Sequence, residues 1–165
     1  MTSPVMRPSV TRQRGVYALE WAIVFPVFFI VLYAILGYGL AFLVRESMQY
    51  AVEDGARAAL RYQPSRQLRF QTAQQVVQNG LNWLPATLKP DLSAVQVQVC
   101  RLSSTSACAA DLVCGADVNT RCLVTVTLAI PYGATPLAPP LPGLGFLVPQ
   151  NLSASASVLA DRGGV

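Results

Sequence analysis

The chain has 165 residues, of which 53% are hydrophobic and 12% are charged, about half the charged share of an average soluble protein. A chain of this length can form one domain of ordinary size. Histidine is absent, which excludes Ser-His-Asp and Cys-His catalysis and every metal site that requires an imidazole ligand. The net charge of +4 comes from scattered arginines and one lysine, so we expect no nucleic-acid partner. We also expect no enzyme activity and no cofactor.

The shortage of charge is concentrated in residues 21–44, a run of 24 residues without a charged side chain. A helix of that length is about 36 Å long and can cross the ~30 Å hydrocarbon core of a bilayer. Arg7, Arg12 and Arg14 precede the run, whereas its far side carries charges of both signs. The positive-inside rule therefore predicts a single-pass protein of the bacterial inner membrane, with a cytoplasmic N-terminus and a periplasmic C-terminal domain. A cleaved secretory signal fits less well, because its apolar core has only about 7 to 15 residues.

Helical periodicity continues beyond this run, through residues 45–62, which contain no proline. The whole stretch favours one helix of about 45 residues. Pro64 and Ser65 then predict a break and a new N-cap, followed by a second amphipathic helix that ends before Pro85. The apolar positions are Met48, Ala51, Val52, Ala56, Ala59 and Leu60 in the first helix, and Leu68, Ala73, Val76, Val77, Leu81 and Leu84 in the second.

Three later segments alternate apolar and polar residues with a period of two, which is typical of strands with one buried face. They are AVQVQVCRL at 94–102, CLVTVTLAI at 122–130 and NLSASASVLA at 151–160. Between the last two, residues 131–149 carry six prolines and are expected to form a long connecting loop. The fold class is therefore α+β, with a small antiparallel sheet of about three strands. We expect the loop to expose Leu137, Leu141, Leu144, Phe146 and Leu147.

The four cysteines, Cys100, Cys108, Cys114 and Cys122, all follow the membrane run, and we expect two disulfides. If the first two strands form a hairpin, Cys100 lies near Cys122 across it, and Cys108 pairs with Cys114 inside the loop. This nested pattern is one of three possible connectivities, and its outer bridge would stabilise the fold by about 3 kcal/mol. A four-cysteine zinc site is the alternative, but the intervals of seven, five and seven intervening residues are wider than zinc usually takes.

The segment before the membrane run, RQRGVYALEW, places Glu20 at the edge of the apolar helix. A carboxylate at the bilayer centre costs about 2.5–3.5 kcal/mol, and less near the interface, so its presence needs a reason. The pattern Arg-x-Arg-Gly, then Val-Tyr-Ala-Leu-Glu, then an apolar helix, resembles the leader of type IV prepilins. The resemblance implies cleavage by a prepilin peptidase between Gly15 and Val16, so that Glu20 becomes the fifth residue of the mature chain. It also implies an ion pair between Glu20 and the free N-terminus of a neighbouring subunit, which would favour assembly in register.

The stretch GVYALEWAIVFPVFFIVLYAILGYGLAFLVRESMQYAVEDGARAAL resembles, more specifically, the TadE-like family, the minor pseudopilins of tight-adherence (Flp pilus) systems. Trp21 beside the glutamate, Pro26 six residues after it, the sequence Gly37, Tyr38, Gly39 and the alanine-rich continuation of the helix carry this resemblance. It implies a pilin-like fold and a subunit needed for assembly or function of a Tad/Flp-type pilus or secretion system. The implied partners are a prepilin peptidase, other pilin-like subunits, the inner-membrane assembly platform and the lipid bilayer.

This interpretation divides the chain into a cytoplasmic leader at 1–15, a transmembrane and extended helix at 16–62, and a periplasmic α+β domain at 63–165. Pro26 has two interpretations, a simple bend or a point where the helix melts locally as it leaves the bilayer. The alternative function is an uncleaved, single-pass, membrane-anchored periplasmic binding domain whose proline-rich loop is the binding surface.

Overall fold

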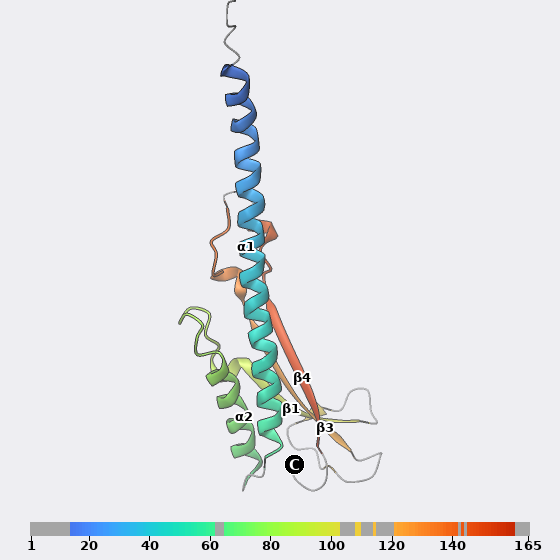
Figure 1. Cartoon of the computed structure of the whole chain (residues 1–165). Helices are drawn as coiled ribbons and strands as arrows, with labels where there is room; N and C mark the ends of the chain where they lie inside the picture. The colour runs from blue at the N-terminus through green and yellow to red at the C-terminus, as the bar shows by residue number, and fades with distance from the viewer. Residues whose placement is uncertain are drawn as a thin grey trace, which may run out of the picture. The chain divides into compact units, whose positions relative to one another are not determined.

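The computed structural model describes residues 14–61, 65–102, 108–109, 114, 121–141, 143 and 145–160. Within these residues the chain forms two α-helices followed by a four-stranded antiparallel sheet, so the expected α+β fold is confirmed (Figure 1). The helices are α1 (Arg14–Ala59) and α2 (Arg66–Gly80). The strands are β1 (Val95–Arg101), β2 (Cys108–Ala109), β3 (Cys122–Ile130) and β4 (Leu152–Ala160), and short 3-10 turns occur at η1 (Leu92–Ala94), η2 (Tyr132–Ala134) and η3 (Gly145–Leu147).

The first helix, α1, is continuous over 46 residues, as its periodicity predicts, and Pro26 lies inside it without ending it. At its end, the backbone N–H of Leu60 donates to the carbonyl oxygen of Arg57, at 3.1 Å. Such a tightened last turn satisfies a carbonyl group that would otherwise be unpaired at the helix terminus. The chain divides into two units between Gly37 and Tyr38, and the second unit contains the rest of α1 with all of α2 and the sheet.

The second helix begins at the predicted N-cap, where the Ser65 hydroxyl accepts a hydrogen bond from the backbone N–H of Leu68. Its buried side chains are Arg69, Ala73 and Val77. The glutamine-rich face has a structural role, because the side-chain amides of Gln74 and Gln78 donate to the carbonyl oxygens of Val95 and Pro90, at 2.9 and 3.3 Å. These bonds tie α2 to the first strand and to the turn before it.

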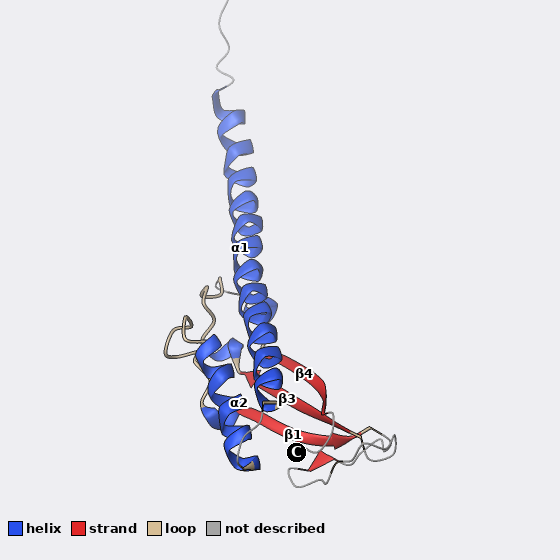
Figure 2. Ribbon diagram, turned by 60° about the horizontal axis from the view of Figure 1, so that its bottom comes forward, coloured by secondary structure: helices blue, strands red, loops and turns tan. Residues whose placement is uncertain are grey.

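The sheet has the strand order β2-β1-β3-β4, and each neighbouring pair is antiparallel (Figure 2). The third strand matches its predicted bounds, and Val126 at its centre pairs with Val97 of β1 and Ala156 of β4. Alternation buries one face of β3, while the hydroxyl groups of Thr125 and Ser157 lie 2.9 Å apart on the other. The two-residue strand β2 is an addition to the three strands that the sequence predicts.

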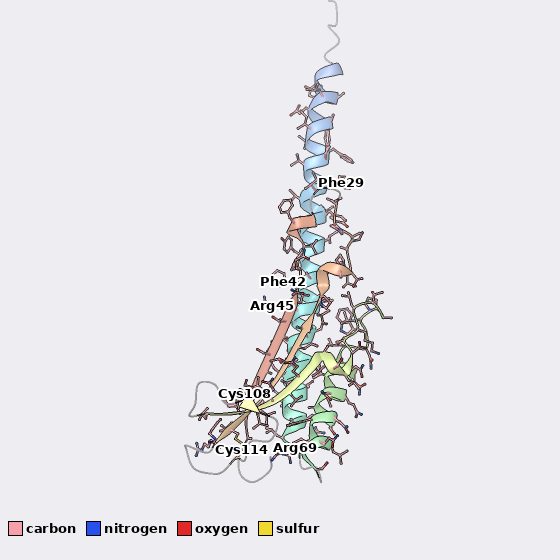
Figure 3. All side chains as sticks on the ribbon, turned by 180° about the vertical axis from the view of Figure 1, so that it is seen from behind. Phe29, Phe42, Arg45, Arg69, Cys108 and Cys114 are labelled. Carbon is pink, nitrogen blue, oxygen red and sulfur yellow. A yellow bond between two sulfur atoms is a disulfide. The ribbon has the colours of Figure 1, made fainter. Side chains whose placement is uncertain are left out.

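The hydrophobic core has two parts that follow the length of the sheet. The first cluster joins Ala41 and Val44 of α1 to Ile130 and Leu152, where β3 ends and β4 begins. The second cluster joins the residues at the opposite end of the sheet, namely Ala59, Ala73, Val99, Cys122, Val124 and Ala160. Figure 3 shows these two ends. Phe42 and Arg45 lie toward one end of this unit, and Cys108, Cys114 and Arg69 lie toward the other.

The cysteines form two disulfides, as expected, but the nested pairing is wrong. The bridges join Cys100 to Cys108 and Cys114 to Cys122, each across a sequence separation of eight residues. The reason is the register of the hairpin. Leu123 is the partner of Cys100 across β1 and β3, so Cys122, one residue earlier, faces the opposite side of the sheet. Cys108 of β2 is instead directly opposite Cys100, with a Cα–Cα distance of 4.0 Å.

The two helices approach each other closely at a glycine. A Cβ atom added to Gly55 of α1 would overlap the Cγ2 atom of Val77 and lie 3.2 Å from the carbonyl oxygen of Ala73, both on α2. A Cβ atom on Gly80, at the end of α2, would lie 3.2 Å from that of Ala51. Small residues on both helices therefore set the distance between them, which explains why α1 carries a glycine in its interior at some cost in helix propensity.

Replacing Gly55 with alanine should lower the free energy of unfolding by about 1–3 kcal/mol, because the added methyl group overpacks the contact with Val77. The matched control is Gly39→Ala in the same helix, where nothing lies within 4 Å and where alanine should raise helix stability by about 0.5–1 kcal/mol. Denaturant unfolding in detergent, followed by circular dichroism, measures both. Equal stability of the two variants would contradict the close approach of α1 and α2.

The two disulfides offer a second matched comparison, because their equal loop lengths give each bridge about 2.5 kcal/mol in the chain-entropy model. Replacing Cys114 and Cys122 by alanine should cost more stability than replacing Cys100 and Cys108. Cys122 is fully buried in the second core cluster, whereas Cys108 is exposed. Unfolding of the two double variants measures the difference, after peptide mapping of the parent has verified the pairing. A larger loss from the Cys100 and Cys108 variant would contradict this ranking.

Candidate membrane anchor and assembly site

The N-terminal part of α1 exposes an apolar surface. Most side chains between Tyr17 and Leu40 are exposed, including the large residues Trp21, Phe25, Phe28, Phe29, Ile35 and Leu36. The helix over Tyr17–Ala59 is long and apolar enough to cross a membrane. A contiguous apolar surface of this size is unfavourable in water, so it requires lipid or another protein around it. Together with the folded domain, this surface indicates a single-pass membrane anchor.

Glu20 lies at the start of this surface, exposed on α1, and among the described residues it has no ion-pair partner. The next charged residue in the chain is Arg45. A carboxylate held next to an apolar surface without a counter-charge costs free energy, and a cation from outside the chain can offset that cost. Within the described residues, the site therefore lacks a counter-charge. Trp21 beside it is 66% exposed and can pack against whatever supplies the cation.

Pro26 lies six residues after Glu20 along α1, beside an aromatic cluster. The rings of Phe25 and Phe29 have centroids 4.5 Å apart, and the rings of Phe28 and Phe29 meet edge to face at 5.7 Å. Proline has no N–H, so the carbonyl oxygen four residues earlier, that of Ala22, lacks its usual intrahelical donor. This makes Pro26 the weakest point of the helix ladder, while the neighbouring aromatic contacts hold the two turns together. Both interpretations of Pro26 remain predictions.

Gly37 and Gly39 mark a part of α1 that is open to close approach from outside. A Cβ atom added to either glycine would find nothing within 4 Å, so packing inside the chain does not require them. Each glycine still lowers helix stability by about 0.5–1 kcal/mol relative to alanine. Small residues on a helix in a membrane let a second helix approach its backbone. We therefore interpret Gly37 and Gly39 as two places where another helix can approach α1, on different sides, because residues two apart on a helix do not face the same way.

A shallow groove follows the outer face of α1 from this point. Its lining residues recur at helical spacings of three and four, which places them on one face: Gly39, Phe42, Leu43, Glu46, Ser47 and Tyr50. Phe42 and Leu43 are more than half exposed. At the polar end, the Glu46 carboxylate accepts a hydrogen bond from Tyr50 and raises the pKa of that phenol above its ordinary value. The groove changes from apolar to polar within three helical turns.

The remaining predicted site residues are placed as follows. Gly15 and Val16 lie in the first turn of α1, and their side chains are outside the described part of the structure. The cysteines belong to the unit that begins at Tyr38, whereas Glu20 belongs to the other unit. The sequence interpretation missed the groove, although the signal was present in the helical spacing of Phe42, Leu43 and Tyr50.

These features define a class of protein: one with a candidate membrane-spanning helix whose C-terminal half is part of a small α+β domain. A protein-family model described as TadE-like protein matches residues 15–57, so the predicted resemblance to the TadE-like family is confirmed for that segment. The family is a structural, pilus-associated one. No curated protein and no solved structure matches the chain.

If Gly37 and Gly39 serve helix–helix contact, replacing both with leucine should weaken self-association or association with a sister subunit without lowering the stability of the monomer. Energy transfer between labelled chains in proteoliposomes measures association, and unfolding in detergent measures stability. Replacing Leu36 and Leu40 with isoleucine is the matched control, because it keeps bulky side chains where the native chain already has them. Unchanged association of the leucine variant would refute the helix–helix contact.

Proposed function

We propose that this protein is a minor pilin-like subunit, or pseudopilin, required for assembly or function of a Tad/Flp-type pilus or secretion system. It is anchored in the bacterial inner membrane with its N-terminus in the cytoplasm and its α+β domain in the periplasm. The family match to residues 15–57 supports this function, and that match begins at Gly15, the residue after which the leader would be cut. The two disulfides are in keeping with an oxidising compartment.

The observation that carries the proposal is the exposed carboxylate of Glu20 at the start of an exposed apolar helix, for which the described residues supply no ion-pair partner. Cleavage between Gly15 and Val16 would create an ammonium group four residues before Glu20, a spacing at which groups on one helix are neighbours, so the chain's own N-terminus would compete for the carboxylate. A neighbouring subunit's new N-terminus can reach Glu20 instead. At 4 Å and an effective dielectric of about 20, such a pair is worth about 4 kcal/mol before desolvation. The pair forms in one register only, so it would align subunits as they enter an assembly.

In this mechanism the other features of α1 have separate roles. The apolar surface keeps the subunit in the bilayer until it is recruited. Gly39 shares the groove with Phe42 and Leu43, so a second helix can approach there and pack against both side chains, while Gly37 leaves room for a helix on another side of α1. The assembly platform and sister subunits are the partners that this surface would contact, and the prepilin peptidase acts before them.

The first experiment determines the N-terminal residue of the protein recovered from membranes, by intact mass and Edman sequencing. A chain that begins at Val16 supports the proposal, and Gly15→Leu should then leave the full leader in place, because the peptidase needs a small residue before the cut. A wild-type chain that keeps residues 1–15 would refute the processing step. The alternative, an uncleaved membrane-anchored binding domain, would then be preferred.

The second experiment concerns Glu20 after cleavage. Glu20→Gln removes the charge and keeps the shape, so it should permit cleavage but reduce assembled pili by about tenfold or more, the effect of losing ~1.4 kcal/mol or more of pairing energy. Asp91→Asn is the matched control, because Asp91 is an exposed carboxylate that makes no capping hydrogen bond. Pili sheared from the cells are quantified by immunoblot. Normal piliation in Glu20→Gln cells would exclude the ion pair.

A further inference from the structure

The C-terminal part of the domain is unusual in its charge. Residues 122–160 contain no charged side chain, although they include two strands and the long proline-rich loop between them. A solvated domain surface normally carries charged residues on its strands and loops. An uncharged stretch of this length indicates that part of it faces something other than bulk water.

The two ends of the loop lie beside a defined part of α1, in the first core cluster. The ends of the flanking strands, Ile130 and Leu152, lie in the same core cluster as Ala41 and Val44. These two helix residues are buried, and they lie in the last turn of the charge-free run, immediately before Arg45. A membrane-spanning helix leaves the hydrocarbon where its charges begin. The residues packed around Ala41 and Val44 are therefore at the level of the membrane surface.

The loop is held firmly at this end. The backbone N–H of Gly133 donates to the carbonyl oxygen of Gln150, at 2.8 Å, which closes the base of the loop. Tyr132 is almost fully buried, and its hydroxyl accepts a hydrogen bond from the backbone N–H of Leu137. Leu137 and Val148 pack against the first core cluster. Leu137 and Leu141 are only partly exposed, which corrects the expectation that both are exposed, and the side chains of Leu144 and Leu147 lie outside the described residues. Phe146 in η3 is 77% exposed, more than any other large apolar side chain among the described residues.

A second segment, residues 81–91, lies at the same end of the domain. Leu84 and Leu88 are buried in the first core cluster, and the Thr135 hydroxyl donates to the carbonyl oxygen of Thr87 at 3.4 Å. This segment exposes Trp83 and Lys89. Tryptophan and lysine are residues that membrane proteins place at the boundary between lipid and water. Both segments thus expose a large aromatic side chain, Phe146 and Trp83, at one end of the domain.

We propose that the described residues of the loop (131–141, 143 and 145–149) and Trp83 form a membrane seat that lies in the headgroup layer of the bilayer that α1 crosses. Phe146 and Trp83 enter the boundary between headgroups and acyl chains. The six prolines suit this layer because they have no backbone N–H to leave unsatisfied in a partly dry environment. The proposal depends on the membrane anchor and not on cleavage or pilus assembly, so the function proposed above can fail while this one holds.

The test places one tryptophan at position 146. Phe146→Trp is made with Trp21→Phe and Trp83→Phe in the full chain, which is reconstituted into phosphatidylethanolamine and phosphatidylglycerol vesicles without any other protein. Lipids brominated near the top of the acyl chain should quench most of its fluorescence, and its emission should be shifted to the blue. The matched control is Leu68→Trp in the same background, an exposed apolar position on α2 at the other end of the domain, where bromolipids should have no effect and aqueous acrylamide should quench.

A second reporter is the native Trp83 in a Trp21→Phe chain, which should show the same quenching by bromolipids. If position 146 is quenched by acrylamide to the same extent as position 68, the loop is in water and the proposal is refuted. A blue-shifted emission at 146 without bromolipid quenching would mean that protein covers the loop, and this too would refute the lipid seat. Unfolding of each variant in detergent verifies that the domain has remained intact.

Discussion

Packing between α1 and the sheet joins a membrane helix to a folded domain, and the rest of the structure depends on that contact. The stripe from Ala41 to Ala59 is buried, and it supplies one wall of both core clusters. The anchor is therefore part of the domain's core and not a tether attached to it. Small residues make this possible, because Gly55 and Ala51 let α2 approach α1 closely while valines and leucines of the sheet fill the remaining volume.

The opposite face of the same helix is not covered by the domain and exposes apolar side chains. Phe42 and Leu43 on that face are exposed, and Gly37 and Gly39 upstream have open space around them. A helix that contributes to a core on one side and exposes apolar surface on the other is suited to a second set of contacts. Glu20 adds a charge that no residue in the described part of the chain balances. The buried stripe thus stabilises the monomer, while the outer face and the carboxylate are available for partners.

Sequence reasoning succeeded where a feature depends on local pattern. It predicted the length of α1, the Ser65 cap and the bounds of β3, because each follows from spacing or from one side-chain bond. It failed where a feature depends on the register or orientation of two elements. A shift of one residue in the β1–β3 register reverses which cysteines share a face, and alternation within each strand does not reveal it. Likewise, the Pro26 region and Glu20 were found from a motif, whereas the groove required knowing which face of α1 the domain leaves open.

The local pairing of the disulfides bears on how the domain can be built. Each bridge joins residues separated by only eight positions, so it can close as soon as its own segment has been synthesised and meets an oxidant, before β4 is available. In the nested pattern, the outer bridge between Cys100 and Cys122 would have required the β1–β3 hairpin to form first. In this protein oxidation can therefore precede sheet assembly, and β3 joins β1 with its cysteine already engaged. The positions of the cysteines in the sequence thus make correct disulfide pairing independent of β4, the last strand to be synthesised.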